Sequence, residues 1–257
     1  MWKVESKIHI LMKKSLHIGL NGVDPNAYGG WPGWLNACVN DARDLASLCA
    51  RAGFEAHGVF NEEATLTRLR TELQSAASEM VAGDVFLLSY SGHGGRSDAW
   101  AMNSYTETIC LYDGELADTA LREFLAAFAP GVKIILLMDS CHSGGLDRDN
   151  DRRSRAKPRF VKSGVREATK TIPVLASVVL NAACRADETA QDGDVNGAFT
   201  GALIKVADTH ENEGKSLTWN GWMKGVQSLM LRDMSSQHPV AVSFGSTADW
   251  NFDVTSG

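Results

Sequence analysis

Apolar and polar positions along this chain follow a pattern that predicts strands alternating with helices. Short continuous apolar runs are typical of strands buried on both faces, and apolar residues three and four positions apart are typical of helices. The sequence predicts strands over 15–20, 54–60, 85–90, 133–138, 173–180 and 240–244, with a short extra strand or hairpin over 108–112. It predicts helices over 38–52, 65–82, 118–128, 198–207 and 218–234. This order indicates an α/β fold, a three-layer α/β/α sandwich around a mainly parallel sheet of about six strands.

Local signals predict where several of these helices begin and end. Thr65 and Asp118 are candidate N-caps, because their side-chain oxygens can accept a hydrogen bond from a backbone N–H of the first turn. Gly53 follows the first predicted helix as its stop, and Pro130-Gly131 ends the third.

Two predicted strands end in small and polar residues that can carry chemistry. The run over 85–90 continues as Ser-Gly-His93-Gly94, and the run over 133–138 continues as Asp-Ser-Cys141-His. The functional crevice of an open parallel sheet lies at the carboxyl ends of its strands. We therefore expect His93 and Cys141 at one edge, where an imidazole can lower the thiol pKa or accept its proton. The amides of Gly94 and Cys141 are candidates for an oxyanion hole.

Each of these two residues also has a structural explanation when it is taken alone. A cysteine at a strand end is usually buried and inert, and a single histidine is usually a satisfied polar residue. A metal site built from His93, Cys141 and His142 is a further alternative, although adjacent residues of an extended chain point in opposite directions. The occurrence of both motifs together favours a cysteine nucleophile with a histidine base.

Composition and charge exclude several classes of function. The 257 residues are 44% hydrophobic and 22% charged, as in ordinary globular proteins, and no apolar run approaches the length of a membrane helix. A net charge of −6 argues against a nucleic-acid binder. Five irregularly spaced cysteines indicate no disulfide framework, and the N-terminus is not a convincing signal peptide. These features predict a cytoplasmic protein without nucleic-acid or membrane partners.

One stretch of the chain departs from the regular pattern and is strongly basic. Residues 148–170 hold nine Lys or Arg against three acids and show almost no periodicity, which predicts an exposed loop. Such a loop is either a solvated connector or a place for proteolytic nicking. The candidate processing positions are Arg148, Arg152, Arg153, Arg155, Lys157, Arg159, Lys162, Arg166 and Lys170.

The segments around His93 and Cys141 resemble the two signature blocks of the metacaspases and their bacterial relatives, the orthocaspases, which are caspase-fold cysteine peptidases. Residues 37–42, 107–113 and 196–203 resemble further blocks of that family in the expected order. The similarity spans about residues 15–244, so no separate prodomain is expected.

The resemblance implies a single caspase-like domain over 1–257. Its large-subunit-like part is expected over 15–147, an exposed inter-subunit loop over 148–172, and a small-subunit-like part over 173–257.

The resemblance also implies that acidic residues hold a basic side chain before the scissile bond. The matching positions are Asp41, Asp139 and Ser91, with Cys38 beside them. Two carboxylates and a hydroxyl suit the guanidinium of Arg or the ammonium of Lys. Without the resemblance, Asp41 could equally be a helix N-cap and Asp139 a hydrogen-bonded loop anchor.

No organic cofactor is expected, and calcium as an activator is left open. Many metacaspases need calcium, which takes six to eight oxygen ligands. Residues 95–113 offer no paired acids, and after Cys141 the candidate ligands are Asp147 and Asp149.

The leading hypothesis is a cysteine endopeptidase, monomeric as metacaspases generally are, that cuts protein or peptide substrates after Arg or Lys. We expect a zymogen that is cleaved within 148–170, by itself or by an upstream protease. One alternative is a catalytically silent caspase-fold protein that acts by binding. Another is a cysteine hydrolase or transferase acting on a small amide.

Overall fold

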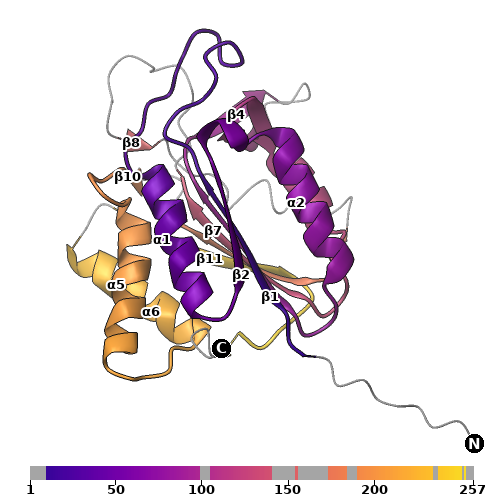
Figure 1. The fold of residues 1–257 in the computed structure, drawn as a ribbon, viewed down its shortest axis with the longest axis vertical. Coiled ribbons are helices and arrows are strands. Elements are labelled where there is room, and N and C mark those ends of the chain that lie inside the picture. Colours follow the sequence, from indigo (N-terminus) through magenta and orange to yellow (C-terminus); the bar gives the residue numbers. More distant parts are fainter. Residues whose placement is uncertain are drawn as a thin grey trace, which may run out of the picture.

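A six-stranded sheet forms the centre of the computed structural model, which describes residues 10–98, 105–140, 154–155, 173–183, 190–233, 237–250 and 252 (Figure 1). The strand order is β11-β9-β7-β3-β1-β2. The strands are β1 (Lys13–Gly19), β2 (Glu55–Phe60), β3 (Val85–Ser91), β7 (Lys133–Asp139), β9 (Ser177–Ala182) and β11 (Val240–Gly245). All neighbours pair in parallel except β9 and β11, which are antiparallel. The predicted α/β fold with a mainly parallel sheet is confirmed.

Helices cover both faces of this sheet and make the structure three-layered. On one face lie α1 (Cys38–Arg51), α5 (Ala198–Asn212) and α6 (Trp219–Asp233), while α2 (Leu66–Glu79) and α3 (Asp118–Leu125) cover the other (Figure 1). Each helix presents an apolar stripe to the sheet, so two hydrophobic cores form, one between each helical layer and the strands.

The central strands β3 and β7 are apolar at successive positions because both of their faces are buried. In β3, Phe86 and Leu88 pack into the core under α2 and α3, whereas Leu87 packs into the core under α1, α5 and α6. All seven residues of β3 are buried. This alternation explains the continuous apolar runs in the sequence.

Smaller sheets lie outside the central one. β4 (Gly94–Asp98), β5 (Tyr105–Leu111) and β6 (Gly114–Ala117) form a three-stranded antiparallel sheet, and β8 (Ser154–Arg155) pairs with β10 (Ala190–Gln191). The strand predicted over 108–112 belongs to β5. β4 and β6 are not predicted by the sequence, because their short glycine-containing segments lack a strand-like apolar pattern.

Several element boundaries differ from the predicted ones. Thr65 is the N-cap of α2, as predicted, and its side chain accepts a hydrogen bond from the Arg68 N–H. α2 ends at Glu79 rather than at residue 82, because the chain becomes extended at Met80 and the Val81 N–H bonds to the carboxylate of Asp84.

The predicted N-cap at Asp118 is wrong by one residue. Ala117 is the N-cap of α3 and Asp118 is its first helical residue, with the Asp118 carboxylate accepting from the Thr119 N–H at 2.6 Å. β9 begins four residues later than predicted, and α5 continues five residues further to Asn212.

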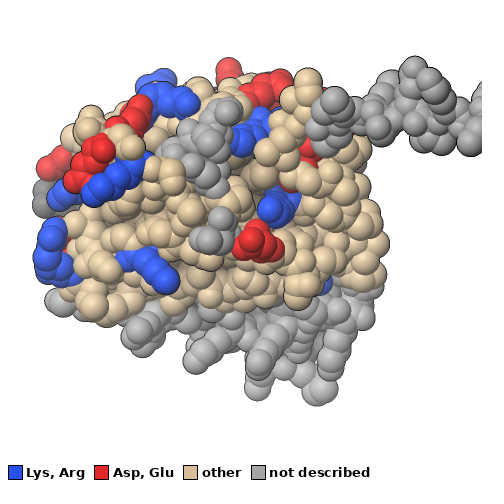
Figure 2. Space-filling view, turned by 90° about the horizontal axis from the view of Figure 1, so that it is seen from below, with Lys and Arg blue, Asp and Glu red and all other residues tan. Residues whose placement is uncertain are grey.

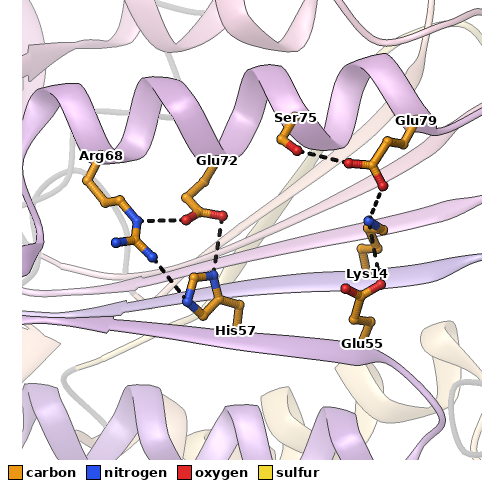
Figure 3. A network of polar contacts seen from close by, with 7 residues as sticks. All are labelled: Lys14, Glu55, His57, Arg68, Glu72, Ser75 and Glu79. Atoms are coloured by element: carbon orange, nitrogen blue, oxygen red, sulfur yellow. Dashed lines mark hydrogen bonds and ion pairs between the residues drawn. The ribbon is translucent and has the colours of Figure 1, made fainter.

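A polar network links α2 to the edge of the sheet (Figure 3). Lys14 of β1 pairs with Glu55 of β2 and Glu79 of α2. His57 of β2 bonds to both Arg68 and Glu72 of α2. Exposed pairs of this kind contribute little stability each, but charged side chains on an edge strand discourage pairing with another chain.

The surface carries charges of both signs. On the face in Figure 2, described Lys and Arg side chains lie beside Asp and Glu side chains. Among the described residues, no helix is long and apolar enough to cross a membrane.

A fully buried histidine lies between the central sheet and α1. His17 of β1 forms hydrogen bonds with Ser89 of β3 at 2.8 Å and with Ser15 at 2.9 Å. Burial lowers the pKa of His17 to about 3, because desolvation penalises the charged imidazole.

This burial predicts a loss of stability in acid. Between pH 6.5 and about pH 3 the unfolded chain binds a proton at His17 and the folded chain does not, so the free energy of unfolding falls as pH falls. At ~1.4 kcal/mol per pH unit, the step from pH 7 to pH 5 should remove about 2 kcal/mol at this residue. Urea unfolding at both pH values should show that His17→Gln lacks this part of the pH dependence. Equal pH dependence in the two proteins would contradict the assignment.

Candidate active site

The site lies where β3 and β7 end side by side. These parallel strands pair with Ser91 opposite Asp139, and the Gly92 N–H donates to the Asp139 carbonyl at 3.4 Å. His93 follows the end of β3 by two residues, and Cys141 follows the end of β7 by the same number. Cys141 lies outside the described residues, but the register brings the two segments that lead to His93 and Cys141 to the same edge of the sheet.

The ring of His93 is held from the loop that follows β1. His93 Nε2 lies 3.0 Å from the Gly33 carbonyl oxygen, and the ring packs on Trp31 with centroids 4.7 Å apart. A carbonyl only accepts hydrogen bonds, so Nε2 must carry the proton, and Nδ1 is then the acceptor nitrogen of the neutral ring. This tautomer suits a base that takes a proton through Nδ1.

The backbone of His93 is fixed as firmly as its ring. Its carbonyl oxygen accepts from the Tyr90 hydroxyl at 2.6 Å and from the Cys110 N–H at 2.9 Å. Gly94, the next residue, begins β4 and is buried. The turn that carries the imidazole is therefore tied both to β3 and to β5.

Gly33 meets two requirements that no larger residue meets together. Gly33 has φ +55, in the left-handed region that residues with a side chain rarely adopt. A Cβ at this position would lie 3.0 Å from the Trp31 ring and 3.2 Å from Cδ2 of His93. The absence of a side chain lets the carbonyl of Gly33 approach the imidazole.

A cluster centred on Asp41 lies at the same edge of the sheet. Asp41 is fully buried in the first turn of α1, and its carboxylate accepts from the Ser91 hydroxyl at 2.6 Å and from the Gly197 N–H at 2.8 Å. Cys38 is the first residue of α1 and is also fully buried. Asp41 therefore joins α1, β3 and the start of α5.

Asp139 forms the second part of this cluster. It is the last residue of β7 and is 3% exposed, and its Oδ2 accepts from both the backbone N–H and the hydroxyl of Thr200, at 3.2 and 2.7 Å. Because Ser91 is opposite Asp139 in the sheet and bonds to Asp41, the structure brings Asp41, Ser91 and Asp139 together.

α1 reaches this position through close packing and a distant cap. A Cβ on Gly19, at the end of β1, would lie only 2.3 Å from the Cys38 carbonyl oxygen, so glycine is needed where helix and strand approach. The Asp192 carboxylate accepts from the backbone N–H groups of Asn36 and Ala37, at 2.8 and 3.2 Å. A residue of the later half of the chain thus caps the entry to α1.

The purely structural roles considered for Asp41 and Asp139 differ in how they agree with the structure. Asp41 is not a helix N-cap, because Ala37 is the N-cap of α1 and Asp41 lies within the helix. Asp139 does act as an anchor, since its carboxylate holds Thr200 of α5.

Other predicted positions lie outside the described residues. These are Cys141, the candidate calcium ligands Asp147 and Asp149, and the processing positions apart from Arg155, which lies in β8. Within the described part of the chain, no group of three or more His, Cys, Asp or Glu residues could hold a metal ion. Cys49 is buried in the core, and its pKa is raised to about 12 by desolvation, so it stays protonated.

Sequence reasoning missed the groups that hold the predicted residues in place. Gly33 acts through a backbone carbonyl, which leaves no side-chain signal. Tyr90 lies inside the motif before His93, where its apolar neighbours suggest only a core position. Thr200 lies in a segment that the sequence marks only as the start of a helix.

Comparisons with known proteins show the family to which the chain belongs. Residues 23–247 match the caspase domain family of peptidases. Metacaspase-1 of Mycosarcoma maydis is 25% identical over 291 residues, which cover 89% of this chain and 71% of that protein. Metacaspase-4 of Arabidopsis thaliana is 31% identical over 150 residues, which cover 53% of this chain and 34% of that protein.

A solved crystal structure is similar over nearly the whole chain. It is a protein of Geobacter sulfurreducens with a TM-score of 0.81 and 34% sequence identity, covering 95% of this chain and 98% of that one.

Because the sequence predicts that His93 lowers the pKa of the Cys141 thiol, Gly33→Ala should disturb the imidazole and reduce the reactivity of that thiol. The added methyl group would push against Trp31 and His93. We expect alkylation of Cys141 by iodoacetamide at pH 6.5 to slow by about tenfold, because a displaced imidazole lowers the thiol pKa less. Mass spectrometry of the peptide that contains Cys141 gives the rate.

Gly29→Ala is the matched control. Gly29 has φ +63 in the same loop, and a Cβ there would meet nothing within 4 Å. An alanine at position 29 therefore imposes similar backbone strain without contacting Trp31 or His93. Equal slowing in both variants would mean that loop strain, and not contact with His93, causes the effect.

Proposed function

Because the chain belongs to the caspase domain family and is a cysteine peptidase of that family, we propose that it hydrolyses peptide bonds after Arg or Lys through a dyad of Cys141 and His93. The observation that carries this proposal is the meeting of two buried carboxylates and a hydroxyl beside the strand end that leads to His93.

The chemistry of that cluster supports a basic side chain before the scissile bond. Asp41 and Asp139 provide two acidic groups, and Ser91 provides a hydroxyl. A guanidinium presents several N–H donors in a fork that matches carboxylate oxygens, and an ammonium pairs with the same charges. A neutral side chain offers these acids no opposite charge, and an acidic side chain would be repelled by them.

The proposed reaction has two stages. His93 Nδ1 takes the proton of the Cys141 thiol, and the sulfur attacks the scissile carbonyl carbon while the amides of Gly94 and Cys141 bind the developing oxyanion. The C–N bond then breaks and the imidazolium gives its proton to the leaving amine. Water then gives a proton to His93 and attacks the thioester carbon. The C–S bond breaks, the imidazolium returns the proton to the sulfur, and the acid product is released.

We further propose that the chain is a zymogen cleaved within residues 148–170. Nine basic residues in one segment offer the proposed activity many bonds to cut. Cleavage by the chain itself and cleavage by an upstream protease with the same preference both fit this segment.

Three further features belong to the proposal. Calcium would act as an activator and not as a participant in bond breaking, with Asp147 and Asp149 as candidate ligands. A reducing, cytoplasmic setting fits the free thiols at Cys38, Cys49 and Cys110. We propose a monomer as the active form.

Wild type and Cys141→Ala provide the direct test. Wild type should hydrolyse a fluorogenic arginyl or lysyl peptide and should show cleavage within 148–170 on a denaturing gel. Cys141→Ala should lose both, with residual peptide hydrolysis down by at least about a thousandfold, because the nucleophile is gone. Each protein is assayed with calcium and with a chelator.

Different failures separate the parts of the proposal. Peptide hydrolysis without cleavage of the chain would refute self-processing, but it would still support the proposed peptidase activity. Equal rates with calcium and with chelator would remove calcium as an activator. A wild-type protein that is cleaved within 148–170 and whose Cys141 alkylates readily, but that hydrolyses neither peptide, would refute the Arg/Lys specificity.

A further inference from the structure

The side chain of Thr200 bonds to one of the two acids of the proposed substrate pocket. Thr200 is fully buried in the first turn of α5, and its hydroxyl lies 2.7 Å from Oδ2 of Asp139. Its backbone N–H reaches the same oxygen at 3.2 Å. An ionised carboxylate only accepts, so both groups of Thr200 donate to Asp139.

Two donors from one rigid helix turn fix how the Asp139 carboxylate is oriented. A buried carboxylate needs donors to remain ionised, and hydrogen bonds to a charged group are stronger than neutral ones. The hydroxyl is the shorter of the two bonds, and it is the donor that a side-chain substitution can remove. Its removal takes away the shorter of the two bonds from Thr200 to this carboxylate.

We infer that Thr200 is a positioning residue for substrate specificity, which orients Asp139 towards the basic side chain of the substrate. This inference rests on the proposed function and names one further residue that sets its specificity. Asp41 has the equivalent support from the Gly197 N–H, three residues earlier in the chain. The first turn of α5 therefore completes a pocket whose two acids come from α1 and β7.

The position of Thr200 explains why its effect should fall on substrate binding. Its hydroxyl bonds to Asp139, whereas His93 is held by bonds from other elements, among them those of Gly33, Tyr90 and Cys110. Loss of the Thr200 hydroxyl should therefore raise KM for a basic substrate and leave kcat nearly unchanged.

Thr200→Val removes the hydroxyl and keeps nearly the same shape, and Thr200→Ser keeps the hydroxyl. Thr209→Val is the matched control, since Thr209 is an exposed residue of α5 whose hydroxyl bonds to the Lys205 carbonyl one turn back. With an arginyl peptide, we expect Thr200→Val to raise KM by about tenfold with kcat within about threefold of wild type. Thr200→Ser should stay within about threefold in KM, and Thr209→Val should match wild type.

A binding measurement keeps the test independent of turnover. Agmatine, which carries a guanidinium, is titrated by calorimetry into Cys141→Ala and into Cys141→Ala/Thr200→Val. The dissociation constant should rise by about tenfold in the double variant. Circular dichroism melting of all variants shows whether each is folded at the assay temperature.

The outcomes separate the inference from the proposed function. An unchanged KM and an unchanged agmatine affinity in folded Thr200→Val proteins would overturn the role of Thr200. So would a loss in kcat at constant KM, or a Thr200→Ser variant as impaired as Thr200→Val. A wild-type protein that is cleaved within 148–170 and still hydrolyses neither an arginyl nor a lysyl peptide would refute the proposed function, and the agmatine titration would still decide whether Thr200 orients Asp139.

Discussion

The parallel pairing of β3 with β7 is the interaction on which the rest of the site depends. Both strands are buried on both faces, so a shift of one residue in register would exchange every side chain between the two cores. The register is therefore strongly specified. It places Ser91 beside Asp139 and directs the two following segments, with His93 and Cys141, to one edge of the sheet.

Burial of two carboxylates at that edge explains why the second half of the chain is needed. An ionised carboxylate removed from water is stable only when donors satisfy it. Asp41 and Asp139 receive donors from Gly197 and Thr200, at the start of α5, where the helix dipole also favours negative charge. The cluster of Asp41, Ser91 and Asp139 and the attachment of α5 to α1 and β7 are thus one structural unit.

The orientation of His93 depends mainly on backbone atoms. The Gly33 carbonyl selects the tautomer, and Tyr90 and the Cys110 amide hold the His93 carbonyl. These groups come from the loop after β1, from β3 and from β5. Backbone groups in defined strands and turns have few alternative positions, so they can hold an imidazole without the entropy cost of ordering long side chains.

The sequence by itself determined the strands over 85–90 and 133–138, because strands covered on both faces require continuous apolar residues. It also determined that histidine and cysteine motifs follow these strands. It misplaced the start of β9, because the apolar residues before Ser177 have the same local pattern as a strand. Only the tertiary structure decided what holds the site. The bonds from His93 to Gly33, from Asp139 to Thr200 and from Asp41 to Gly197 join residues 60, 61 and 156 positions apart, and contacts at such separations leave no periodic trace in the chain.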